Sequence, residues 1–217
     1  MNQKHLSMTN TLLIICGVVL LLAAVWTLLS WLAVRTIEQP KYTVLEKLPT
    51  YEIREYAPYI VAEVEVSGSR KESLNEGFRI LAGYIFGGNR SRDPLLMTPP
   101  VEEFFSVEIP MTAPVVEQVT GATRKVTFSM PSQYTLATLP IPKDPRVYFY
   151  EIPARKMAVK RFSWWASESR FARIQESLLS DLKKDGREVI GTPYFAGYTP
   201  PFSAPWMHRN EAMVVVK

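Results

Sequence analysis

The stretch that decides the fold reads Gly77-Phe78-Arg79-Ile80-Leu81-Ala82-Gly83-Tyr84-Ile85-Phe86-Gly87-Gly88-Asn89, followed after a loop by Met111-Thr112-Ala113-Pro114-Val115. Its first part continues an apolar stripe at spacings of three and four, the period of a helix with one apolar face: Leu74, Phe78, Leu81 and Ile85. Gly87-Gly88-Asn89 ends this helix, because glycine and asparagine tolerate the left-handed backbone of a C-cap. Valines beside a proline between Met111 and Val119 predict a strand that begins at a sheet edge.

The residues before this stretch predict two strand regions and the start of the helix. Alternation of apolar and polar residues, the period of a half-buried strand, occurs over 42–46, 51–56 and 60–66. Ser69 is the expected N-cap, and Glu72 three residues later completes a capping box.

The same order of elements occurs again after the stretch. Strands are expected over 125–131, 146–152 and 156–162, then a helix after Ser167 that ends at Asp185-Gly186, then strands over 194–198 and 212–216. Strand, strand, helix, strand, strand thus occurs twice. We therefore predict an α+β, pseudo-two-fold domain in which two ββαββ halves share a curved, mostly antiparallel sheet, with both helices packed on it.

An apolar N-terminal segment precedes the domain. No charged residue occurs over 11–34, and about 24 apolar residues suffice to cross a hydrocarbon core of roughly 30 Å. Trp26 and Trp31 lie near its C-terminal end, where indole rings favour the membrane interface. The chain therefore divides into a tail (1–10), a transmembrane anchor (11–34), a linker (35–40) and a domain (41–217). A cleaved signal peptide is the alternative, but its apolar region is usually shorter.

The sequence gives two conflicting signals about the side of the membrane on which the domain lies. Lys4 precedes the anchor and Arg35, Lys41 and Lys47 come after it, so the positive-inside rule favours a cytoplasmic domain. A short tail before a signal anchor instead favours export of the domain behind the anchor. We expect a single-pass protein with its domain on the exported, periplasmic side.

Composition excludes several classes of protein. The formal charge of +4 is not gathered into a basic stripe, which argues against nucleic-acid binding. Cys16 is the single cysteine, so no intrachain disulfide can form. The usual zinc, serine-hydrolase and dinucleotide motifs do not occur, and Glu102-Glu103 is the expected solvated carboxylate pair of a loop. We expect no catalysis, with a hydrolase as the alternative.

Aromatic and sulfur-bearing residues among prolines indicate an apolar pocket for a flat ligand, with core packing as the alternative for each: Met111, Met130, Tyr194, Phe195, Tyr198, Phe202, Trp206 and Met207. His208 is the candidate iron ligand of the domain, unless it is a surface-loop histidine. Arg209, Arg79 and Arg90 are candidates to bind ligand carboxylates, because guanidinium groups bind carboxylates bidentately.

The chain resembles the SOUL haem-binding protein family. The resemblance covers nearly all of 41–217 and is carried by stretches in family order: Tyr42-Thr43-Val44, Tyr51–Tyr56, Gly77–Asn89, Met111–Val115, Val126–Pro131, Ala158–Ser163, Ala196–Pro201 and Arg209–Ala212. It implies a distorted antiparallel β-barrel of two repeated halves, each with a helix, and the binding of haem or another tetrapyrrole in an apolar groove beside the first domain helix, at Leu74, Phe78, Leu81 and Ile85.

The chain departs from the family pattern in two places. His208 stands where many members have arginine, so a histidine ligand there is not part of the pattern. Met97-Thr98-Pro99-Pro100-Val101 nearly repeats the later Met-Thr-Ala-Pro-Val and extends the loop of 89–110 beside the proposed groove. The resemblance predicts a membrane-anchored haem or tetrapyrrole carrier or buffer. The alternative is an interaction subunit of a membrane complex without a functional haem site.

Overall fold

The computed structural model describes residues 2–92, 106–120 and 123–217. Much of the extended loop, including Met97–Val101 and Glu102-Glu103, lies outside the described residues.

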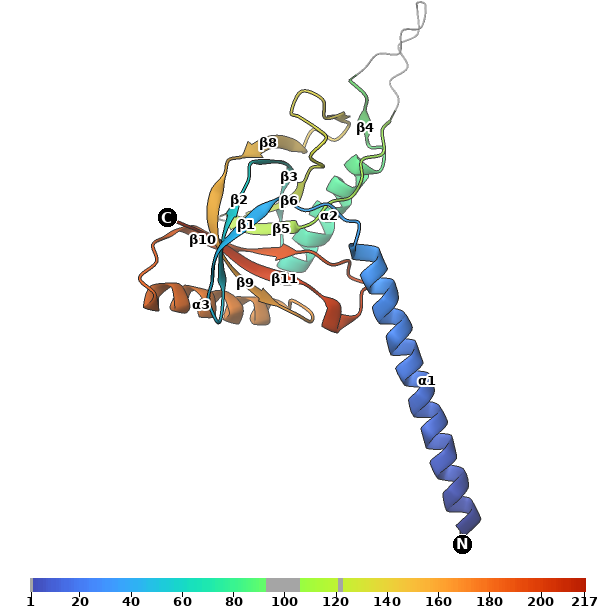
Figure 1. The fold of residues 1–217 in the computed structure, drawn as a ribbon. Coiled ribbons are helices and arrows are strands. Elements are labelled where there is room, and N and C mark those ends of the chain that lie inside the picture. Colours follow the sequence, from blue (N-terminus) through green and yellow to red (C-terminus); the bar gives the residue numbers. More distant parts are fainter. Residues whose placement is uncertain (1, 93–105, 121–122) are drawn as a thin grey trace, which may run out of the picture.

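The N-terminal segment is one long helix, α1 (Asn2–Val34), which projects from the domain with the N-terminus at its far end (Figure 1). Its part from Asn10 to Val34, with a mean hydropathy of 2.9, is long and apolar enough to cross a membrane. By length and composition alone, this helix suits either a signal anchor or a signal sequence.

The domain is built on a nine-stranded sheet whose paired strands are all antiparallel, in the order β1-β2-β9-β11-β10-β5-β6-β3-β8. Its strands are β1 (Tyr42–Lys47), β2 (Glu52–Tyr56), β3 (Tyr59–Ser67), β5 (Val115–Thr120), β6 (Thr123–Ser129), β8 (Tyr148–Ile152), β9 (Arg155–Phe162), β10 (Val189–Gly197) and β11 (Asn210–Val216). A separate short pair joins β4 (Asn89–Arg90) to β7 (Ile141–Pro142). The α+β class with a curved antiparallel sheet is confirmed.

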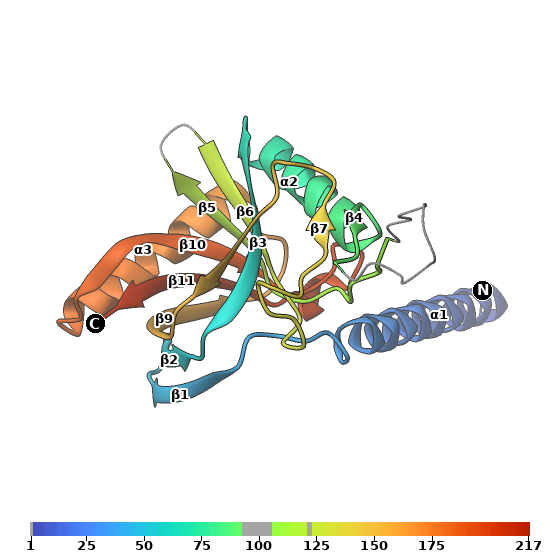
Figure 2. The same cartoon turned by 90° about the horizontal axis from the view of Figure 1, so that it is seen from above.

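Both domain helices pack on the same face of the sheet (Figure 2). Helix α2 (Arg70–Ile85) covers β3 and β6, where Leu81 and Ile85 meet Val64 and Val126 in one apolar cluster. Helix α3 (Glu168–Lys184) covers β9, β10 and β11, where Leu178 and Leu182 are fully buried.

The predicted helix ends are confirmed. Ser69 and Glu72 form the capping box of α2, and Ser167 accepts a hydrogen bond from the backbone of Arg170 at the start of α3. Gly87 lies just after α2 with φ +99°, a conformation that glycine adopts without steric cost.

Two expectations about the sheet are wrong. The sheet does not close into a barrel: β1 and β8 remain its edges, which makes it a curled half-barrel. The strand after Pro114 is not at an edge either, because β5 pairs with β10 on one side and β6 on the other. Pro114 precedes the first paired residue, Val115, so its missing N–H removes no ladder hydrogen bond. The repeat of two halves stays a prediction.

The face of the sheet opposite the two helices, which we term the inner face, carries an unusual set of residues. An apolar cluster of Met157, Val159, Ala196 and Met213 lies there beside three buried tyrosines: Tyr56, Tyr194 and Tyr198. Arg155 of β9 also lies close to β3, with its Nη2 3.4 Å from the hydroxyl of Tyr59, because β9 pairs with β2 at Tyr56 and β2 turns directly into β3.

Candidate functional site

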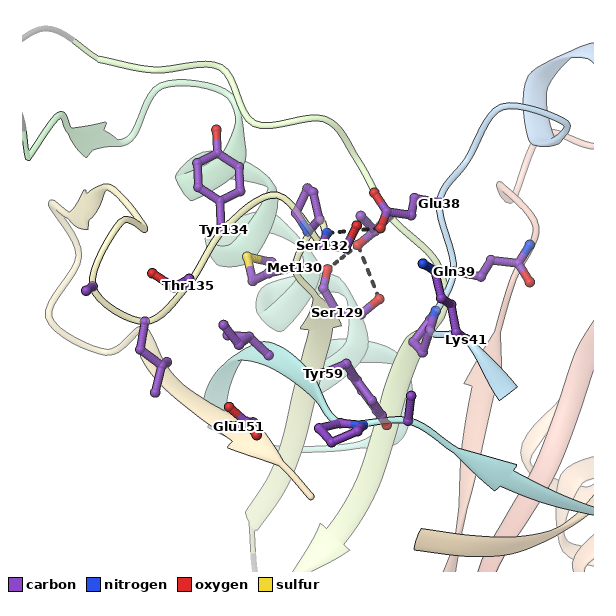
Figure 3. Close-up of a pocket in the computed structure, with 18 residues that line it drawn as sticks. Glu38, Gln39, Lys41, Tyr59, Ser129, Met130, Ser132, Tyr134, Thr135 and Glu151 are labelled. Carbon is purple, nitrogen blue, oxygen red and sulfur yellow. Dashed lines mark hydrogen bonds between the residues drawn. The ribbon is translucent and has the colours of Figure 1, made fainter. Parts of the chain in front are cut away.

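One cavity of the domain lies beside the β2–β3 turn, between the segment before β1 and the chain after β6. This outer cavity has a volume of about 550 Å³, within the usual size of small-molecule sites. Its walls come from the segment before β1 (Glu38–Lys41), the β2–β3 turn (Ala57–Ile60) and the chain after β6 (Met130–Ala137), with Glu151 of β8 (Figure 3).

Apolar side chains form much of the wall of the outer cavity. Ile60, Met130 and Leu136 contribute aliphatic and thioether surface, and Tyr59 and Tyr134 contribute rings. Met130 is buried at the floor, where it joins the apolar cluster beneath α2. Such a wall suits a flat apolar ligand, because rings and a polarizable thioether adapt to its faces.

A smaller inner cavity of about 240 Å³ adjoins the outer one on the inner face of the sheet. The two cavities share Tyr59, Ser129 and Glu151 as lining residues. The inner cavity adds ionisable and hydroxyl side chains to the apolar ones, notably Glu63, Lys125, Tyr150, Arg155 and Tyr194. Both cavities therefore combine apolar and polar lining, and the inner one adds the guanidinium of Arg155.

Arg155 is the unusual charge of the inner cavity. Its Nη2 donates to the hydroxyls of Tyr194 at 2.9 Å and Tyr59 at 3.4 Å, while its buried Nε has no hydrogen-bond partner. Among the described residues, no carboxylate forms an ion pair with it. Burial alone would lower the pKa of Arg155, but the nearby hydroxyls of Tyr194 and Tyr59 raise it, so the guanidinium stays charged.

Glu63, by contrast, is fully engaged. Its carboxylate accepts hydrogen bonds from Lys125 Nζ at 2.8 Å and from the hydroxyl of Tyr150 at 2.5 Å. Burial, and then the bond to Glu63, raises the pKa of Tyr150, so the phenol remains a donor at neutral pH. The local charge of Glu63 is thus balanced, and Arg155 is left to face the cavity.

The predicted groove residues lie on the opposite face of the sheet from the inner cavity. Leu81 and Ile85 are 0% and 1% exposed in the core beneath α2, and Leu74 and Met111 pack against the same core. Phe78 is 37% exposed and packs edge to face on Phe128. The structure brings this group together around α2, but none of its members lines either cavity. A groove there stays a prediction.

Arg209 lies on the inner face but is already occupied. Its guanidinium bonds Glu211 at 2.9 Å and Gln39 at 2.9 Å, and it stacks 3.8 Å from the ring centre of Tyr198. Glu211 is fully buried and also pairs with Arg54 at 3.0 Å. Binding a ligand carboxylate would require Arg209 to leave these partners.

His208 is 7% exposed, so the interpretation as a surface-loop histidine is wrong. Its Nε2 lies 3.1 Å from the carbonyl oxygen of Ser203, and its ring packs against Trp165. It lines neither cavity, so its role as a metal ligand stays a prediction without support from these contacts. Within the described part of the chain, no group of three or more His, Cys, Asp and Glu residues could hold a metal ion.

Sequence reasoning missed the importance of Tyr59, Glu63 and Arg155. Period-two alternation does place Glu63 on the face opposite Ala62 and Val64. The pattern gives no sign, however, that Arg155 reaches the same cavity, because its place depends on the pairing of β9 with β2 and of β8 with β3.

The curled antiparallel sheet with both helices on one face makes this domain an α+β half-barrel. The chain belongs to the SOUL heme-binding protein family, whose model matches residues 37–215. No curated protein matches it in sequence.

Solved structures share the fold at low identity. The crystal structure of the EcmrR C-terminal domain is 13% identical, with 81% of this chain and 98% of that chain covered and a TM-score of 0.51. EcmrR in a cryo-EM structure of its DNA complex is 13% identical, with 100% of this chain and 73% of that chain covered and a TM-score of 0.53. At these identities the likeness shows the fold alone.

Proposed function

We propose that the protein is a membrane-anchored, non-catalytic carrier or buffer of a hydrophobic small molecule that bears carboxylates, with haem or another tetrapyrrole as the ligand class. The ligand lies in the outer cavity and its carboxylate reaches Arg155 in the inner one. The domain stands on the exported side of the membrane, and its two halves are related by the repeat expected from the sequence. The strand order supports that repeat. From β10 outward come β11, β9 and β2, and from β5 outward come β6, β3 and β8. On each side, the two strands after the helix of one half come first, then the strand before that helix, and then a strand of the other half.

The observation that carries the proposal is the unpartnered Nε of Arg155 at a cavity beside an apolar one. A half-buried guanidinium without a carboxylate incurs a desolvation cost that no ion pair offsets. A ligand carboxylate that displaces one of the two tyrosine hydroxyls from Nη2 would accept from Nε and Nη2 together, the bidentate geometry that arginine favours. The apolar wall with Met130 and Tyr134 would cover the macrocycle. The residues thus fit the faces and edge of a tetrapyrrole, while neither cavity offers an imidazole to its iron.

The test is a hemin titration of the full chain in lipid nanodiscs, monitored by the Soret band. Ala137 is exposed at the outer cavity, so Ala137→Trp should fill that cavity and weaken binding by roughly tenfold or more, given the contact area lost. Ala172→Trp, on the exposed face of α3, is the matched control and should leave the affinity unchanged. His208→Ala should retain the Soret shift.

Arg155→Met tests the carboxylate contact. It should weaken hemin binding by roughly tenfold to a hundredfold, the loss of one charge-assisted hydrogen-bonded pair of about 1.5–3 kcal/mol. With haem dimethyl ester, whose carboxylates are capped, wild type and variant should bind alike.

Phe78→Ser probes the groove beside α2. If Phe78→Ser abolishes binding while Ala137→Trp does not affect it, the proposed site is wrong.

A further inference from the structure

The end of α1 and the domain are joined by hydrogen bonds between specific side chains and backbone groups. Trp26 Nε1 donates to the carbonyl of Phe202 at 3.0 Å, and Trp206 Nε1 donates to Thr27 Oγ1 at 3.1 Å. The backbone N–H of Ala204 donates to Ser30 Oγ at 2.8 Å, and Ser30 is only 2% exposed. The segment before β11 is therefore fixed against α1.

These contacts occur well inside the apolar part of α1. A helix rises about 1.5 Å per residue, so Trp26 lies about 12 Å before Val34, where the apolar run ends. When Asn10–Val34 is centred in a hydrocarbon core of roughly 30 Å, Trp26 and Thr27 lie about 8 Å inside its boundary. A segment bonded to them lies at or below the level of the headgroups.

Four large aromatic side chains are exposed on the two loops at this height. Phe202 and Trp206 belong to the segment bonded to α1, and Trp164 and Trp165 lie in the β9–α3 loop, with exposures of 41–69%. The two loops are adjacent, because the N–H of Trp164 donates to the carbonyl of Pro205 at 3.0 Å. Large rings exposed together are costly in water and favourable at a membrane interface.

The polar groups of this region suit the same environment. The carbonyl of Phe202, the N–H of Ala204 and the indole N–H of Trp206 all find partners on α1. Backbone groups at membrane depth require such internal partners, because lipid offers none.

From these observations we infer that Trp164, Trp165, Phe202 and Trp206 form a lipid-contacting surface that seats the domain in the leaflet at the C-terminal end of its own anchor. The inference rests on the proposed anchor but not on the proposed ligand. The occupant is the acyl and headgroup region of the bilayer. The domain therefore lies on the membrane rather than at the end of a tether.

The test uses nitroxide labels on the full chain in phosphatidylcholine nanodiscs, after Cys16→Ser removes the free thiol. Phe202→Cys and Trp165→Cys report on the surface, and their collision rates with oxygen and with a water-soluble nickel chelate are compared. Tyr148→Cys on β8, where the native side chain is 60% exposed, is the matched domain control. Leu20→Cys in the middle of α1 reports on the anchor.

At positions 202 and 165 we expect a severalfold higher ratio of oxygen to nickel-chelate collisions than at position 148. If both positions match 148 while position 20 lies in lipid, the inference is overturned and the anchor stands. If position 20 is also reached by the nickel chelate, the anchor fails and the inference fails with it. The hemin titration is read separately, so loss of ligand binding is distinguished from either result.

Discussion

Glu211 is the centre of a buried network of ion pairs in the domain. It is fully buried and lies between the guanidinium groups of Arg54 and Arg209. The bond to Arg54 joins β11 to β2 across β9, which lies between them in the sheet. Two residues of the Arg209–Ala212 stretch, Arg209 and Glu211, thus have a structural role.

Glu211→Ala should therefore lower the free energy of unfolding by about 3–5 kcal/mol, because it leaves the buried guanidinium of Arg54 without its main anionic partner. Denaturant unfolding of the full chain, monitored by circular dichroism, measures the loss. Asp144→Ala is the control: it removes a half-exposed pair with Arg146 and should cost at most about 1 kcal/mol. Equal losses in the two variants would contradict this account.

Tyr51 gives a pH dependence whose sign can be stated. Burial and then its hydrogen bond to Asp185, at 2.5 Å, raise its pKa to about 12. The unfolded chain, with a tyrosine pKa of about 10, loses this proton first. The stability from Tyr51 is therefore complete below pH 10 and falls as the pH rises toward 12.

Tyr51→Phe isolates this contribution from the other tyrosines. The difference in unfolding free energy between wild type and variant should shrink between about pH 9 and pH 11.5, since the proton is then lost on unfolding. A difference that stays constant across this interval would show that the hydroxyl does not hold its proton more tightly in the folded chain.

At the scale of elements, α2 meets β6 at a glycine. A Cβ on Gly77 would lie 2.6 Å from a methyl carbon of Val126, closer than real contacts allow. Gly83, on the exposed side of the same helix, has nothing within 4 Å of its would-be Cβ. One helix therefore carries two glycines with opposite consequences.

Gly77→Ala should destabilise the domain by about 1–3 kcal/mol, because overpacking displaces α2 from the sheet. Gly83→Ala should stabilise it by about 0.5–1 kcal/mol, because alanine loses less conformational entropy in a helix. Thermal unfolding of both variants compares them within one background. The same sign for both would mean that β6 yields to the added methyl group.

The elements that could be predicted are those whose causes are local. Ser69 with Glu72, Ser167 and Gly87 fix helix ends through groups within a few residues, and all were predicted correctly. The position of β5 inside the sheet could not be predicted, because its pairing with β10 and β6 depends on the arrangement of the whole sheet. Tyr59 and Arg155 could not be identified as cavity residues for the same reason, because they are 96 positions apart in the sequence.

At the scale of the whole molecule, the open side of the sheet and the site coincide. A closed barrel would pair β1 with β8, and the outer cavity extends from Lys41, which precedes the edge strand β1, to Glu151 of the edge strand β8. The apolar helix was evident from composition, since a continuous run of 25 residues needs no tertiary information.

The segment between α1 and the domain is itself structured. Glu38 accepts hydrogen bonds from the N–H groups of Ala113 and Ser132, Gln39 binds Arg209, and the carbonyl of Lys41 accepts from Ala57. A free six-residue spacer would let a domain sweep a radius of about 20 Å. Here these hydrogen bonds hold the domain in one position relative to α1. For the anchored carrier that we propose, the effective concentration of the cavity would be near zero at every height above the bilayer but one, and a donor or acceptor of the ligand would have to present it at that height.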